Sequence, residues 1–407
     1  MSKNKANQLT IEVTKFTTNL GLLDAFIKAN VLKMDDLLGG MSESKDEKIY
    51  RKKFNYSAIV ILLYGYFENF IERIAEEYVK AIAAVAENFE QLPREIQQNH
   101  FSKSIELAKK SNLDKYKSLT RDQIIANLFS CQNIQSKEFT VNVKAYSVHN
   151  ANFRCNTIDA IFADVGVKRI NEEIINEDDF FSYLKKSDDT DFQLGKSKDF
   201  FLKASRLKLE QTLEEIAQRR NEIAHGAEVD DILSPEILQT KYIDFLKQYA
   251  QSLEQVLQAS FERILIAYEL KNYIQIGRPV KTWQKGYVVG FSDVSIDIKS
   301  RIVVGDEVMI ETSKKQSKEY KKVKILEIRV FQKTQDFDEV IIKTSKKQSK
   351  EYKNVSQLEL SAAPLSFTLK LDQKIKKNHV VFVEKSSVRI QVGEVTNGEK
   401  RLGSLSG

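Results

Sequence analysis

Apolar residues recur every three to four positions through most of residues 1–270, which predicts amphipathic helices. Long helices joined by short turns are typical of an antiparallel bundle. The expected helices cover 20–38, 50–86, 197–224 and 235–270, and the first half of the second is apolar nearly all round. Residues 100–175 are irregular, and we expect them to form an insertion of short helices.

The ends of the last two expected helices carry recognisable signals. Ser197 is placed as the N-cap of one helix, and Gly226 follows its end. Ser234 and Pro235 suit the N-cap and first position of the next. The sequence thus predicts a helical domain over residues 1–270.

The pattern changes near residue 271 to short β-branched runs separated by polar turns, which predicts a separate all-β domain, a small barrel. We expect a linker at 271–282, the β domain at 283–395 and a tail at 396–407. The runs that carry this expectation are 287–289, 302–304, 308–310, 367–371 and 380–383.

An internal repeat lies within the expected β domain. The segment TSKKQSKEYK occurs at 312–321 and again at 344–353, which predicts a duplicated hairpin with a Lys-rich loop. The repeat is either a phosphate-contacting rim or a duplicated solvated loop. The candidate RNA-binding side chains are Lys314, Lys315, Lys318, Lys346, Lys347 and Lys350.

Charge is distributed unevenly along the 407 residues. The chain has a net charge of +6, but residues 271–407 carry 27 Lys and Arg against 16 Asp and Glu, whereas residues 1–270 are net negative. A basic C-terminal part favours a polyanionic partner such as nucleic acid. A Lys-rich solvated surface is the other interpretation, and both stay open.

Several classes of protein fit poorly. Cys131 and Cys155 form no Cys-x-x-Cys pair, so a zinc or redox motif of that kind is not expected. The polar N-terminus lacks the apolar core of a signal peptide, and the apolar run 58–67 is short for a bilayer. We expect a cytoplasmic protein without a membrane segment, a metal or a cofactor.

One arginine stands on an apolar helix face. Leu209, Leu213, Ile216, Arg220 and Ile223 step by four, three, four and three positions, so they share one face. A buried unpaired charge is costly, so this guanidinium needs a carboxylate, an anionic ligand or a wet crevice.

His225 is the candidate acid–base group among only four histidines, since His100, His149 and His379 have no partner at a recognisable spacing. It lies five residues after Arg220, roughly 140° round an ideal helix, but Gly226 ends the helix there. Its side chain is then free to turn toward Arg220. From spacing alone a structural role stays open, in which Arg220 pairs with a buried carboxylate and His225 caps the helix.

Two further residues bear on Arg220. Glu68 lies in an apolar stretch and is the candidate partner of the guanidinium, unless it faces solvent beside Glu72. Arg219 is a rival to Arg220, which we prefer because it lies on the apolar face and Asn221 follows it.

The string Arg220-Asn221-Glu222-Ile223-Ala224-His225 resembles the Arg-x4-His motif of the HEPN ribonuclease superfamily. The segment 64–70, YGYFENF, is similar to an aromatic-Glu helix of MAE-type HEPN-like nucleases. The order of the expected helices is also similar, and the resemblance covers about residues 10–270.

The resemblance implies a metal-independent endoribonuclease that works as a homodimer, with one Arg-x4-His from each subunit in a composite site. It implies that His225 serves as general base or acid and that Arg220 holds the phosphate. Asn221 and Glu68 are the supporting residues. A toxin-like or defence effector acting on RNA such as tRNA is the expected role, with an antitoxin as a candidate partner.

The β domain resembles, more weakly, the β-barrel second domain of translation elongation factors, through residues 304–308, 323–330 and 367–383. The duplicated hairpin interrupts that pattern. This resemblance implies docking on tRNA or the translation machinery. Two other functions stay open: an inactive HEPN bundle that binds RNA or a protein, and a small-nucleotide sensor.

Overall fold

The computed structural model describes residues 3–32, 44–116, 119–132, 138–186, 198–226, 231–296, 300–314, 317–331, 352–360 and 365–385. The chain divides into two compact units, residues 1–264 and 265–407. Helices make up the first unit and antiparallel strands dominate the second, so the expected fold class is confirmed.

The first helix is longer than the sequence predicted. Helix α1 runs Lys3–Phe26 and continues as a π-helical turn, η1, at Ile27–Leu32. Its buried side chains are spaced alternately by three and four residues and are Leu9, Val13, Phe16, Leu20, Leu23 and Ile27. Polar Thr, Asn and Lys residues lie between the buried positions in the first half of this helix, so the apolar face was not recognised from the sequence.

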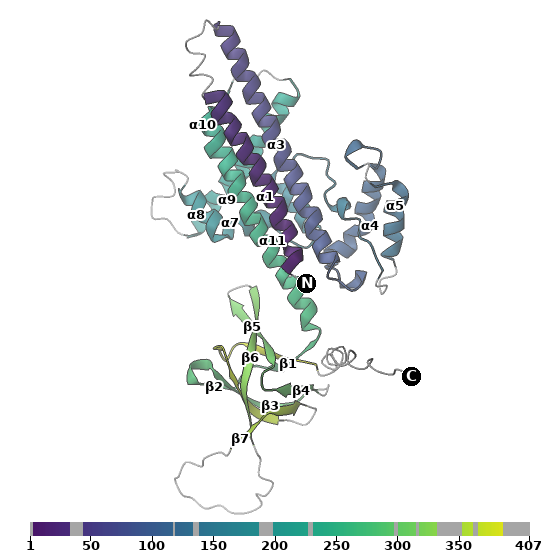
Figure 1. Cartoon of the computed structure of the whole chain (residues 1–407), viewed down its shortest axis with the longest axis vertical. Coiled ribbons are helices and arrows are strands. Elements are labelled where there is room, and N and C mark those ends of the chain that lie inside the picture. The colour runs from purple at the N-terminus through teal and green to yellow at the C-terminus, as the bar shows by residue number, and fades with distance from the viewer. Residues whose placement is uncertain are drawn as a thin grey trace, which may run out of the picture. The chain divides into compact units, whose positions relative to one another are not determined.

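Helix α3, Lys45–Ala83, forms the spine of the helical unit. Ser44 caps it: its hydroxyl accepts from the Glu47 amide and the Glu47 carboxylate accepts from the Ser44 amide. Helix α3 packs against α1 and against α9, Lys198–Ala224 (Figure 1). The last helix begins at Ser234 and Pro235, as predicted, and its segments are α10 Pro235–Ile237, π-helical η6 Leu238–Ile243 and α11 Asp244–Leu270.

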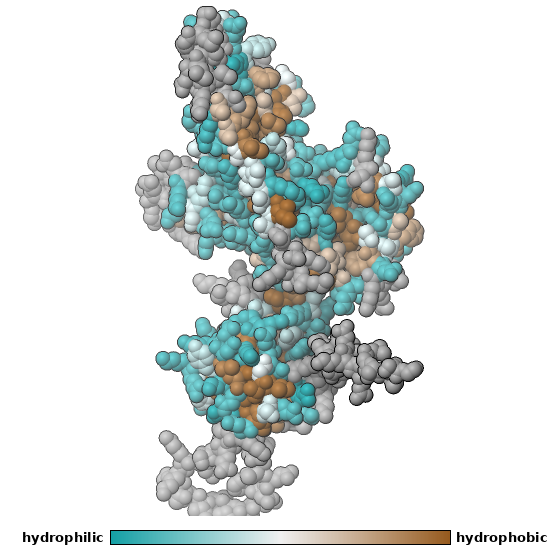
Figure 2. All heavy atoms as spheres, in the orientation of Figure 1, coloured by the Kyte–Doolittle hydropathy of each residue, from teal (hydrophilic) through white to brown (hydrophobic). Residues whose placement is uncertain are grey.

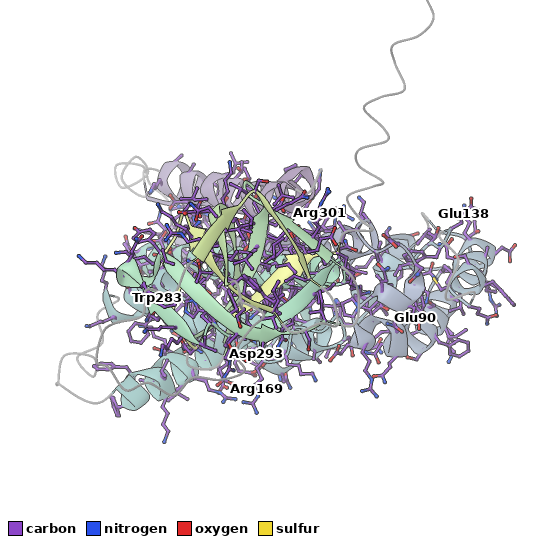
Figure 3. All side chains as sticks on the ribbon, turned by 90° about the horizontal axis from the view of Figure 1, so that it is seen from below. Glu90, Glu138, Arg169, Trp283, Asp293 and Arg301 are labelled. Carbon is purple, nitrogen blue, oxygen red and sulfur yellow. The ribbon has the colours of Figure 1, made fainter. Side chains whose placement is uncertain are left out.

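Short helices join α3 to α9, where the sequence predicted an insertion. They flank the long helices, with α4 and α5 on one side and α7 and α8 on the other (Figure 1). Glu90 and Glu138, labelled in Figure 3, both belong to the α4–α5 side. The elements are η2 Phe89–Gln91, α4 Arg94–Lys109, η3 Asp114–Tyr116, α5 Arg121–Ser130, η4 Val143–Tyr146, α6 Cys155–Ala163, α7 Ile170–Asn176 and α8 Asp178–Lys186.

Part of the apolar surface of the helical unit is exposed. Large hydrophobic side chains reach solvent on α1 at Leu22 and on α3 at Tyr50, Phe54 and Leu62. Figure 2 shows hydrophobic surface in the upper part of this unit. None of the helices in the described ranges combines the length and apolar content that a bilayer crossing needs.

The β unit is one curled antiparallel sheet with a small two-stranded sheet, β4–β8, beside it. The large sheet has the order β1-β10-β5-β6-β9-β3-β2, and β7 also pairs with β6. Its strands are β1 Tyr273–Gly277, β2 Lys281–Trp283, β3 Val288–Val294, β5 Glu307–Lys314, β6 Ser317–Phe331, β7 Tyr352–Val355, β9 Leu365–Leu371 and β10 Val380–Glu384; the small sheet holds β4 Ser300–Val303 and β8 Gln357–Leu360.

The large sheet curls into a half-barrel around a continuous apolar core, as the view in Figure 3 shows. Strand β6 produces the curl because it is long enough to pair with β5 near its start and with β9 and β7 farther on. The end strands β1 and β2 do not pair with each other in the described part of the chain, so the predicted barrel is an open one.

The first copy of the repeat forms the predicted hairpin. Strands β5 and β6 pair up to Lys314 opposite Ser317, and Lys318 lies opposite Ser313. Only the backbone of Lys314 and Lys318 is described. Lys315 and the second-copy lysines, Lys346, Lys347 and Lys350, lie outside the described residues, as does the tail at 396–407.

Candidate functional site

The apolar face of α9 is buried along its length and opens at its C-terminal end. Leu209, Leu213 and Ile216 are almost fully buried, whereas Arg220 and Ile223 are partly exposed. The charged position on this face therefore lies where the core ends, so the guanidinium keeps access to water.

The helix ends as the sequence predicted. Gly226 has a φ of +71°, a left-handed conformation that glycine adopts without strain, and its N–H donates to the Ile223 carbonyl. The His225 amide still donates to the Asn221 carbonyl, at 2.9 Å. The His225 residue is exposed, and its ring forms no hydrogen bond with another described residue.

Arg220 rests on an aromatic ring from α3. Its guanidinium carbon lies 5.1 Å from the centroid of the Tyr64 ring, and Nη1 donates to Asn221 Oδ1 at 3.1 Å. Neither Glu68 nor any other described carboxylate forms an ion pair with it. Its positive charge is thus held in place by a π face and an amide, and is left for an anion.

A loop of the insertion locks this arrangement. Asn152 Nδ2 donates to Asn221 Oδ1 at 3.1 Å, and the Tyr64 hydroxyl donates to Asn152 Oδ1 at 3.3 Å. The same hydroxyl accepts the Phe153 amide at 3.0 Å. Burial raises the pKa of Tyr64, so its phenol stays protonated and keeps donating at neutral pH.

Arg219, the rival arginine, is fully engaged in structure. Its Nη2 lies 3.0 Å from Glu215 Oε1 and 3.0 Å from Asp231 Oδ2, and Nη1 donates to the Tyr56 hydroxyl at 2.9 Å. Burial alone would lower the pKa of Arg219, but the bond with Asp231 and its acidic surroundings raise it. This side chain, 13% exposed, has its donors occupied within the fold.

Arg220 lines an open pocket of about 590 Å³ between α3, α9 and the insertion. Glu68 lines the same pocket, whereas Asn221 and His225 do not. The other lining residues are Lys110, Leu113, Lys115, Tyr116, His149, Asn150, Ala151, Asn152, Arg154, Asn156 and Thr157.

Glu68 belongs to a charge cluster on the pocket floor. It lies 3.5 Å from Lys115 Nζ and 3.8 Å from His149 Nε2, while Glu72 lies 2.6 Å from His149 Nε2 and also binds Lys115. The structure thus gives Glu68 the partner Lys115, where the sequence suggested Arg220. Glu68, Glu72 and His149 could hold a metal ion by spacing, but the Lys115 ammonium already supplies a cation to both carboxylates.

The remaining histidines have structural contacts. His100 is buried and its Nε2 accepts the Asn142 amide at 3.1 Å; burial lowers its pKa to about 4. Both ring nitrogens of His149 face acceptors, Ala151 O at 2.7 Å and Glu72. His379 Nδ1 accepts the Lys376 amide at 3.3 Å. Neither nitrogen of His149 is therefore turned to a substrate, in contrast to His225.

Sequence reasoning missed most of the pocket. Tyr64 lay inside the aromatic segment that carried the resemblance, but nothing marked it as the support of Arg220. Asn152 and Arg154 come from the irregular insertion, where no periodic pattern is present. Asn152 lies 69 positions before its partner Asn221, so no local signal connects the two.

The RiboL-PSP-HEPN family model matches residues 26–259, which is more than half of the chain and most of the helical unit. This range includes the Arg-x4-His segment and the pocket residues. No curated protein and no solved structure matches the chain. From the family match, the chain belongs to the RiboL-PSP-HEPN family.

Proposed function

We propose that this protein is an endoribonuclease whose reaction needs no metal and in which Arg220 and His225 act on the scissile phosphodiester. HEPN domains are a family of metal-independent ribonucleases, and the family match covers both residues. The observation that carries the proposal is the state of Arg220: a fixed guanidinium on a pocket wall without a carboxylate partner among the described residues.

The chemistry follows from the two side chains. His225 of one subunit takes the proton of the ribose 2′-OH, and the 2′-oxygen attacks the adjacent phosphorus. The bond from phosphorus to the 5′-oxygen breaks, and this oxygen takes a proton from the protonated His225 of the second subunit. The products are a 2′,3′-cyclic phosphate and a 5′-hydroxyl. Arg220 stabilises the charge that builds on the phosphate oxygens. The need for a 2′-OH makes RNA the substrate.

A homodimer suits this site. His225 does not line the pocket that Arg220 lines within one subunit, so a second copy would complete the catalytic set. Exposed apolar side chains of α3, Tyr50, Phe54 and Leu62, lie within two helical turns of Tyr56, whose hydroxyl binds Arg219 beside the motif. Apolar surface of this kind favours self-association.

The biological role we propose is a toxin-like or defence effector that cuts tRNA or another translation-associated RNA. The basic β unit would dock that RNA, and an antitoxin or a component of the translation machinery is the protein partner this role calls for. The charge excess of residues 271–407 supports a polyanionic partner.

The direct test is cleavage of cellular RNA by the purified full-length protein in EDTA. We expect cleavage with cyclic-phosphate ends, lost in His225→Ala while circular dichroism and the melting temperature stay unchanged. Expression of the wild type should slow growth, and His225→Ala should relieve this. Asn176→Ala, on the exposed face of α7, is the control.

One result would contradict the ribonuclease, and another would contradict only the composite site. RNA that stays intact but is bound would identify an inactive bundle that serves as a binding module. A strictly monomeric protein at micromolar concentration in ultracentrifugation, still active, would remove the composite site while leaving the ribonuclease in place.

A further inference from the structure

We infer that the pocket beside Arg220 binds one nucleotide of the RNA, the one whose 3′-phosphate lies on Arg220, and selects its base. This inference rests on the proposed function, because it names the substrate subsite of the same centre. The insertion between α3 and α9 then determines which RNA sequence is cut.

The size and make-up of the pocket suit a nucleotide. Its volume of about 590 Å³ falls in the range of small-ligand sites, which runs from about 300 to 1,000 Å³. Its lining includes three side-chain amides, Asn150, Asn152 and Asn156. Both amide atoms of Asn150 and of Asn152 already bond within the fold, which leaves Asn156 as the amide for the edge of an unpaired base.

The distribution of charge favours a single phosphate. Lys110 pairs with Glu106 at 3.4 Å, Arg154 with Glu214 at 3.1 Å, and Lys115 with Glu68 and Glu72. Among the described cations that line the pocket, Arg220 is the one without a carboxylate partner. A di- or triphosphate carries several negative charges but would meet only one available guanidinium here. A phosphodiester carries one negative charge, which one guanidinium can balance.

Two other lining residues offer groups for a base. Leu113 is 50% exposed and presents an apolar surface on which a base can lie. Asn156 Oδ1 accepts the Thr157 amide at 2.8 Å, which fixes the side chain, while its Nδ2 donates to no described residue. The pocket therefore combines a phosphate contact, an apolar face and a free amide donor.

The insertion connects the Arg220 side of the pocket to Asn156. Asn152 bonds Asn221, which holds Arg220, and the chain continues from Asn152 through Arg154 to Asn156 in the first turn of α6. A base seated against Asn156 thus fixes its 3′-phosphate relative to Arg220. Correct bases would be cut faster because only they hold the phosphodiester in line with the attacking oxygen.

The test is calorimetric titration of the full-length protein with the four nucleoside 3′-monophosphates and with inorganic phosphate. We expect one of the four nucleotides to bind at least about tenfold tighter than inorganic phosphate, and tenfold tighter than the weakest-binding nucleotide. Asn156→Ala should reduce that preference about threefold to tenfold, the value of one hydrogen bond, and Leu113→Glu should abolish it. Asn176→Ala is the matched control.

Mononucleotide binding does not depend on cleavage, so the two proposals fail separately. Equal affinity for all four nucleotides and for phosphate, or a base preference that both variants retain, overturns the subsite. If RNA is cut but Leu113→Glu cuts the same positions, the subsite is wrong and the ribonuclease stands. If base preference follows Asn156 while RNA stays intact in every assay, the pocket stands as a nucleotide site and the ribonuclease falls.

Discussion

The guanidinium of Arg220 stacks over the ring of Tyr64, with 5.1 Å between the guanidinium carbon and the ring centroid. The two residues lie far apart in the sequence, on α9 and α3. A ring face attracts a cation without neutralising it, so Tyr64 positions the charge while the donors that do not bind Asn221 remain for a phosphate.

The first prediction concerns this support. Tyr64→Leu should lower the cleavage rate about tenfold, because the guanidinium loses the ring face and Asn152 loses its hydroxyl donor. Tyr64→Phe keeps the ring and should retain more activity than Tyr64→Leu. Initial rates on a single RNA substrate measure both. Equal rates in the two variants would show that the ring face contributes nothing.

Arg219 and Arg220 form a natural matched pair. We expect Arg220→Ala to lower kcat/KM about 10²–10³-fold with little change in the melting temperature, since it removes charge stabilisation from the transition state. Arg219→Ala should instead destabilise the fold by about 1–3 kcal/mol, because Asp231 and Tyr56 lose their bond to the guanidinium and Glu215 keeps only Lys241 as its cation.

Thermal melts and initial rates together separate these two roles. The reverse pattern, with Arg219→Ala inactive but stable and Arg220→Ala unfolded, would move the phosphate contact to Arg219. Arg220→Lys is a finer probe, because an ammonium keeps the charge but loses the planar fork, so it should rank between wild type and Arg220→Ala.

The end of the helix that carries Arg220 was predictable from the sequence because its signals are local. An arginine on an apolar helix face, a histidine five residues on and a glycine after it all lie within seven positions of one helix end, and the observed helix ends there. The partner of Arg220 was not readable. Glu68 and Tyr64 are one turn apart on α3, and choosing between them needed the loop at Asn152, which no periodic pattern places.

The β unit shows the same division between local and distant signals. Short β-branched runs predicted strands at the right places, since alternation is local. Whether the sheet closes into a full barrel depends on the pairing of strands that lie far apart in the sequence. Strand β6 pairs with β5 near its start and with β9 and β7 farther on, and this long strand gives an open half-barrel that no single run of residues reveals.

Acid sensitivity should arise at His100. Burial lowers its pKa from 6.5 to about 4, whereas the unfolded chain binds the proton near pH 6.5. Stability is therefore fully present above pH 6.5 and falls as the pH drops toward 4, by on the order of 3 kcal/mol. His100→Gln keeps an acceptor for the Asn142 amide but does not titrate, so its unfolding free energy should change less over this interval. Urea melts at each pH measure it; parallel curves would contradict the role of His100.

The Lys-rich hairpin gives the last prediction, since its lysines either bind RNA phosphates or belong to a solvated loop. If Lys314, Lys315 and Lys318 bind phosphates, replacing all three by Gln should weaken RNA binding. The slope of log affinity against log salt should also become shallower, by about 0.7 for each phosphate of single-stranded RNA that the variant no longer neutralises.

Second-copy variants at Lys346, Lys347 and Lys350 test the repeat separately. Gln at the exposed Lys185, Lys186 and Lys203 removes the same charge from the helical unit and is the control. Filter binding between about 50 and 200 mM salt measures the slopes. A slope that changes equally in the hairpin and control variants depends on net charge alone, and would identify the repeat as a solvated loop.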